Sequence, residues 1–143
     1  MSGAHELEIS MPGGRRVEAR VGRHVIHTDQ PLDNGGSDTA ASPFELFLAS
    51  IGTCAGIFVQ GFCAKRGIPF DEIRIVERAD LDAHGVLQSV DLELQLPSTF
   101  PDRYREAIIQ VVVQCSVKRA IAAQPQFSVR TAPVRPINVE AVG

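Results

Sequence analysis

The chain has 143 residues, a size typical of one globular domain, with 44% hydrophobic residues, 22% charged residues and a formal net charge of -3. This balanced charge gives no electrostatic basis for binding nucleic acid, so nucleic acid is not an expected partner. The first eight residues carry neither a basic region nor an apolar run like those of signal peptides, which favours a cytoplasmic location. Three cysteines without disulfide-type spacing indicate reduced thiols.

Residues 1–41 predict a strand meander followed by a loop. From residue 5 to residue 29, apolar and polar side chains alternate in short runs, which are separated by Pro-Gly-Gly at residues 12–14 and by Gly22. A period of two with such breaks is typical of consecutive β-strands. Residues 30–41 are polar and contain a Gly-Gly pair that can adopt positive φ, so we expect a loop there.

A long helix is predicted over residues 42–66. Ser42 can cap the first turn, Pro43 suits the first helical position, and Glu45 completes a capping box with Ser42. Gly67 is the expected end of the helix, because glycine readily takes the left-handed conformation found there.

The middle of this helix, residues 46–64, contains no charged side chain. Nineteen such residues are long enough to cross a membrane, so a membrane helix is one interpretation. The other is a helix buried on all sides in a soluble domain. The neighbouring strand patterns, which have apolar faces to cover, favour the buried helix, and no membrane partner is expected.

The next two elements predicted are a hairpin over residues 71–97 and a second helix over residues 99–124. The first segment contains two alternating runs joined at His84-Gly85, as in a β-hairpin. The second opens with Thr-Phe-Pro-Asp and repeats apolar residues at spacings of three and four. This pattern predicts one continuous helix with Cys115 on its buried face.

The end of the chain, residues 126–143, predicts a last strand near residues 127–131 and then a loosely held tail. The order of strands and helices, without the regular alternation of a doubly wound parallel sheet, predicts an α+β fold. We expect a single domain over residues 1–143.

The candidate chemistry lies in Cys54 and Cys115, because two packed helices could bring their sulfur atoms together. Cys63 is nine residues after Cys54, half a turn out of phase on the same helix, and should face away. Reactivity needs the thiolate, and a cysteine with a reference pKa of ~8.5 is only a few per cent ionised at neutral pH. A donor from elsewhere in the fold would have to activate Cys54. Alternatively all three cysteines are structural, since free cysteines usually act as small buried hydrophobes.

Other catalytic constellations are missing from the sequence. His24 and His27 are three residues apart on a predicted strand, so they point to opposite faces and do not suggest a metal site. Neither the G-x-S-x-G motif of serine hydrolases nor the GK[ST] of a P-loop occurs. The sequence therefore favours thiol chemistry over these classes.

Three motifs are informative together: Ser-Pro-Phe-Glu-Leu at residues 42–46, Ser-Ile-Gly-Thr-Cys-Ala-Gly at 50–56, and Cys-Ser-Val-Lys at 115–118. They resemble the OsmC/Ohr family, the osmotically inducible and organic hydroperoxide resistance proteins, and the similarity runs from about Gly22 to Phe127. The resemblance implies a two-layer α+β fold, with antiparallel sheets around two long central helices. It also implies an intertwined homodimer with sites at the interface.

The same resemblance implies thiol peroxidase activity toward organic hydroperoxides. Cys54 would attack the peroxide and become a sulfenic acid, and Cys115 would resolve that acid as a transient disulfide. An external dithiol would then reduce the disulfide. No metal ion and no organic cofactor are implied.

The family's site carboxylate has no match at its usual position. Peroxidase branches carry glutamate immediately after the helix-start proline, where this chain has Phe44. Glu45 is the candidate replacement, although its capping-box role by itself explains it fully. Phe44 also favours an alternative function, in which a dimer-interface pocket binds a small apolar molecule or a reactive sulfur species without efficient peroxide turnover.

The family also has an arginine that stabilises the thiolate. Four arginines precede the predicted helix, at residues 15, 16, 20 and 23. Arg15, which follows two glycines, most resembles the hydroperoxide resistance pattern, and Arg23 is the second candidate. A solvated charge at a hairpin turn is the alternative interpretation of Arg15.

Overall fold

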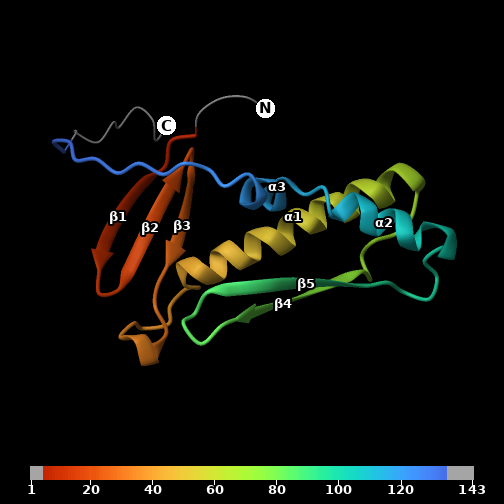
Figure 1. Cartoon of the computed structure of the whole chain (residues 1–143), viewed down its shortest axis with the longest axis horizontal. Coiled ribbons are helices and arrows are strands. Elements are labelled where there is room, and N and C mark those ends of the chain that lie inside the picture. Colours follow the sequence, from red (N-terminus) through yellow and green to blue (C-terminus); the bar gives the residue numbers. More distant parts are fainter. Residues whose placement is uncertain (1–4, 135–143) are drawn as a thin grey trace. The chain divides into compact units, whose positions relative to one another are not determined.

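The computed structural model describes residues 5–134 (Figure 1). The chain divides into two compact units. Among the described residues, the first contains residues 5–46 and 127–134, and the second runs from Phe47 to Gln126. Both units combine antiparallel strands with helical segments, as the α+β prediction requires.

The first unit contains a three-stranded antiparallel sheet in the order β1-β2-β3. Its strands are β1 (Glu8–Gly13), β2 (Arg16–Val21) and β3 (His24–Thr28). The connection between β2 and β3 is tight because Gly22 has a φ of 57°, a value that glycine adopts without a steric penalty. The predicted meander is thus confirmed.

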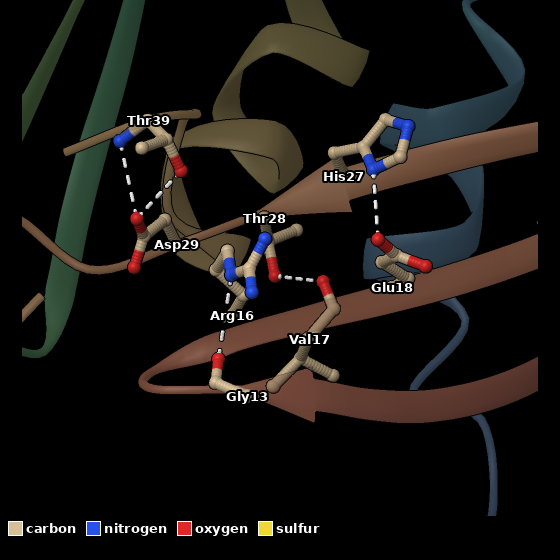
Figure 2. Close-up of polar contacts among 8 residues, drawn as sticks. All are labelled: Gly13, Arg16, Val17, Glu18, His27, Thr28, Asp29 and Thr39. Carbon is tan, nitrogen blue, oxygen red and sulfur yellow. Dashed lines mark hydrogen bonds and ion pairs between the residues drawn. The ribbon is translucent and has the colours of Figure 1, made fainter. Parts of the chain in front are cut away.

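Asp29 organises the loop after β3, and it is buried, with 1% of its surface exposed. Figure 2 shows its carboxylate accepting hydrogen bonds from the backbone N–H and the hydroxyl of Thr39, at 3.1 and 2.7 Å. The N–H of Gln30 also donates to it, at 2.7 Å. These donors, with the Thr39 hydroxyl foremost, lower the pKa of Asp29 to about 2. The loop, which includes a 3₁₀ turn at Leu32–Asn34, is therefore held by a buried charge.

The long helix α1 spans Pro43–Arg66. Its capping box forms as predicted: the Ser42 N–H donates to Glu45 Oε1 at 3.0 Å, and the Glu45 N–H donates to Ser42 Oγ at 3.3 Å. Gly67, with a φ of 65°, follows the last helical residue. The sequence signals at both ends of this helix were sufficient to locate it.

The prediction that this helix is buried on all sides was wrong for the single chain. Only 28% of its most apolar 18-residue window is buried, and Ile57 is 65% exposed. By length and composition alone α1 could cross a membrane, a test that core helices of soluble proteins also pass. One hairpin and two short helices are too small to surround a helix of this length.

The second unit contains the predicted hairpin, formed by β4 (Arg74–Leu81) and β5 (Leu87–Gln95). Asp82 fixes the turn by accepting hydrogen bonds from the N–H groups of His84 and Val86, at 2.8 and 2.9 Å. Apolar side chains of α1, of the residues flanking the hairpin and of the following helix form the core: Ala55, Val59, Phe62, Cys63, Ile73, Phe100, Ile108 and Val112.

The predicted second helix is not continuous. A 3₁₀ turn at Asp102–Tyr104 leads into α2 (Arg105–Val112), and α3 (Ser116–Ala122) begins only after a break. Three consecutive valines end α2, and β-branched residues lose side-chain freedom in a helix. Cys115 consequently lies outside both helices as the N-cap of α3, with an extended ψ of 137°.

The predicted last strand at residues 127–131 is not formed among the described residues. The side chains of Phe127 and Val129 are 91% and 98% exposed, so this apolar run has no covering layer within the described part of the chain. Alternation alone does not make a strand, because a strand also needs a neighbouring edge to pair with. Most of the predicted tail lies outside the described residues.

Candidate functional site

Cys54 lies about three turns into α1 and is partly exposed. Its sulfur is near the start of α3, where Cys54 Sγ is 3.5 Å from Ser116 Oγ. The two residues are 62 positions apart in the sequence, so tertiary folding of the second unit creates this contact. A partly exposed thiol beside polar donors differs from an ordinary core cysteine.

These donors change the acidity of Cys54. The hydroxyl of Ser116 contributes most to lowering its pKa, followed by the backbone N–H of Val117, and the pKa falls to about 7. The side chain of Cys115 and the N–H of Ser116 add smaller effects, while burial opposes them. At pH 7 roughly half of the Cys54 thiol is therefore ionised.

The break between α2 and α3 explains why backbone donors reach Cys54. The first N–H groups of a helix have no carbonyl partner within that helix. In α3 these groups belong to Ser116 and Val117, whereas the N–H of Arg119 already donates to the Cys115 carbonyl at 3.1 Å. A continuous helix, as the sequence predicted, would have used the same N–H groups internally.

Cys115 is buried, with 2% of its surface exposed, and it lies close enough to Cys54 for its thiol to help lower the pKa of Cys54. Both residues are free thiols in this structure. The structure therefore brings together the two cysteines that the sequence singled out, although Cys115 reaches the site from a helix end.

Cys63 faces the core, as the helical phase predicted. It is fully buried among the apolar residues of the second unit. Burial raises the pKa of its thiol, and the charge of Arg66 only partly opposes this effect. Cys63 has the environment of a structural cysteine.

Two other predicted site residues, Arg15 and Glu45, belong to the first unit, whereas the cysteine pair belongs to the second. Arg15 is exposed in the turn between β1 and β2, where its neighbour Arg16 donates to the Gly13 carbonyl at 3.4 Å (Figure 2). Glu45 is occupied by its bonds with Ser42, which lower its pKa. The second candidate arginine, at position 23, is exposed in the turn before β3.

Sequence reasoning missed Ser116 and Glu77. Glu77 lies on β4 in phase with Ile73 and Ile75, and burial raises the pKa of its carboxyl. A Cβ added to Gly52 of α1 would lie 2.6 Å from Glu77 Oε1, so the carboxyl packs directly on that glycine. A glutamate at an inward position of an alternating strand was the available signal, whereas nothing marked Ser116.

An open groove of about 480 Å³ lies between β5 and α2 in the second unit. Its walls are mainly aliphatic, and two cations, Arg105 and Lys118, also line it. The aliphatic residues are Val90, Leu92, Leu94, Leu96, Ile108, Ile109, Val112 and Val113. Such a surface suits an apolar molecule or an apolar part of another chain.

Comparisons with known proteins agree with this architecture. The family model described as OsmC-like protein matches residues 35–130. No curated protein matches the chain.

Among solved structures, an OsmC-like protein from Mycoplasma pneumoniae aligns with a TM-score of 0.69 at 11% identity, covering 87% of this chain and 91% of that one. An organic hydroperoxide resistance protein from Elizabethkingia anophelis aligns with a TM-score of 0.59 at 19% identity, covering 87% and 93%. One from Legionella pneumophila, named an organic hydroperoxide resistance protein OsmC, gives 0.53 at 20%, covering 83% and 89%. At these identities the likeness shows the fold.

Proposed function

Because the chain belongs to the OsmC-like protein family, we propose that it is a thiol peroxidase that reduces organic hydroperoxides through Cys54 and Cys115. The observation that carries the proposal is the contact of Cys54 Sγ with the start of α3, where hydroxyl and N–H donors favour the thiolate. Solved structures with this fold include proteins named for organic hydroperoxide resistance, which supports the same substrate class.

In the proposed reaction the Cys54 thiolate attacks the terminal peroxide oxygen and the O–O bond breaks. The leaving alkoxide takes a proton to give an alcohol, and Cys54 becomes a sulfenic acid. The Cys115 sulfur then attacks the Cys54 sulfur, the S–O bond breaks, and water leaves as the disulfide forms. Two exchange steps with an external dithiol restore both thiols. A reducing cytoplasm suits this cycle because it keeps that dithiol available.

The test is steady-state reduction of cumene hydroperoxide with dithiothreitol at pH 7. We expect turnover by the wild-type chain and none by Cys54→Ser, because serine gives no thiolate. Cys115→Ser should consume about one equivalent of peroxide and then stop or slow strongly. Cys63→Ser is the matched control on the same helix and should retain wild-type turnover. A wild-type rate no higher than that of Cys54→Ser would contradict the proposal.

The proposed active form is a homodimer. The uncovered apolar surface of α1, including Ile57, and the exposed Phe127 and Val129 support this assembly, because large apolar areas are usually covered by a partner. Light scattering after size exclusion should give twice the mass of the 15.5 kDa chain. Ile57→Glu should shift the protein toward the monomer, whereas Ala83→Glu, in the exposed turn between β4 and β5, is the control.

The groove between β5 and α2 favours a second candidate function, the binding of a small apolar molecule or a reactive sulfur species without efficient peroxide turnover. Phe44, at the family's glutamate position, is consistent with it. A fluorescent apolar probe such as 1-anilinonaphthalene-8-sulfonate would test the groove. Probe binding that Leu94→Glu abolishes, combined with absent peroxide turnover, would favour binding over catalysis.

A further inference from the structure

Ser116 is the residue that the cysteine mechanism leaves without a role. It is the first residue of α3, directly after Cys115, and its side chain is exposed. Its hydroxyl oxygen is nevertheless 3.5 Å from Cys54 Sγ, within hydrogen-bonding distance for sulfur. The hydroxyl therefore touches the atom that would react.

The chemistry of this contact depends on the charge of the sulfur. A thiolate can only accept hydrogen bonds, whereas a serine hydroxyl can donate one, so the contact favours the ionised form of Cys54. The hydroxyl of Ser116 is the largest contributor to the lowered pKa of Cys54, ahead of the Val117 N–H. The contributors that lower this pKa all belong to the segment 115–117.

We propose that Ser116 is a catalytic residue whose hydroxyl holds Cys54 as a thiolate. The role of Ser116 in turnover rests on the proposed peroxidase function. Its effect on the thiolate does not, because that effect is a property of the resting protein and can be measured without peroxide.

The experiment measures alkylation of Cys54 by iodoacetamide in the full chain between pH 5 and pH 10, with the modified peptide quantified by mass spectrometry. We expect Ser116→Ala to slow Cys54 alkylation at pH 7 by about five-fold, because most of the thiolate is lost while the backbone donors remain. Ser116→Thr keeps a hydroxyl and should stay within about two-fold of wild type. Ser89→Ala, which removes a hydroxyl on β5, is the control and should not change the profile.

Circular dichroism and melting temperature establish that each variant is folded, and Ser116→Gly is a second variant that removes the hydroxyl. An unchanged Cys54 profile in both the alanine and the glycine variants would overturn the proposal. So would a threonine variant as slow as alanine, or a Ser89→Ala variant that loses as much Cys54 reactivity as Ser116→Ala. If alkylation changes as expected but cumene hydroperoxide is not turned over, the peroxidase proposal fails and the assignment of Ser116 as thiolate donor stands.

Discussion

Cys54 and Cys63 lie on the same helix, yet the structure gives their thiols opposite properties. Cys54 contacts donors at the start of α3, and its pKa is lowered to about 7. Cys63 packs in the apolar core, where burial raises its pKa. Cys54 lies in the middle of α1 and Cys63 in its last turn, but burial is the largest cause of the raised pKa of Cys63. The difference shows that the packing on each face of a helix decides whether a cysteine is reactive or structural.

Alkylation of the native protein should show the largest contrast. At pH 7 Cys54 is about half ionised and partly exposed, whereas Cys63 is neutral and buried. We therefore expect Cys54 to react with iodoacetamide on the order of 100-fold faster than Cys63. The Cys54 rate should rise with pH and reach half its maximum near pH 7, because the thiolate accumulates above its pKa. Equal alkylation rates for the Cys54 and Cys63 peptides would contradict the proposed difference between the two thiols.

Stability should depend more on Cys63 than on Cys54, which is the reverse of their order in reactivity. Cys63→Ser places a hydroxyl in an apolar core and should lower the free energy of unfolding by about 1–3 kcal/mol. Cys54→Ser, at a partly exposed polar position, should change it by less than about 0.5 kcal/mol. Urea denaturation followed by circular dichroism measures both. A larger loss of unfolding free energy for Cys54→Ser than for Cys63→Ser would contradict the assignment of Cys63 as the structural cysteine.

Two carboxyl groups, Asp29 and Glu77, show the same opposite effects of hydrogen-bond donors and burial on pKa. Donors lower the pKa of Asp29 to about 2, while burial raises the pKa of Glu77. Because the pKa of Asp29 is lowered from 3.8, its stabilising contribution is full above pH 4 and is lost as the pH falls toward 2. We expect Asp29→Asn to melt at a lower temperature than wild type at pH 6. The difference in melting temperature should become smaller at pH 2.5, and thermal melts between pH 6 and pH 2.5 measure it.

The smallest expected effects concern two glycines of α1. A Cβ at Gly56 meets nothing within 4 Å, so Gly56→Ala should stabilise the single chain by about 0.5–1 kcal/mol. A Cβ at Gly52 would approach Glu77 Oε1 to 2.6 Å, so Gly52→Ala must displace that carboxyl and should gain less. Urea denaturation of both variants measures the difference. If Gly56→Ala is the more destabilising, a partner chain covers that face.

Local patterns predicted much of the fold. The capping box at Ser42 and the glycine at position 67 located α1, and alternation located the meander and the hairpin. These features depend on neighbours within a few residues, which the sequence displays directly. The break before Cys115 and the missing strand at residues 127–131 were not predicted, because apolar spacing indicates which residues prefer burial but does not show where a helix stops or whether a strand finds a partner.

The sequence by itself determined that Cys54 and Cys63 occupy opposite faces of one helix, because helical phase depends only on their spacing. It also supplied the motifs of the OsmC-like family. Only the tertiary structure decided which face meets hydrogen-bond donors. The hydroxyl of Ser116 and the N–H of Val117 come from a segment some sixty residues away, and they are available only because α2 ends before Cys115. Acidity depends on such through-space contacts, which a linear pattern does not encode.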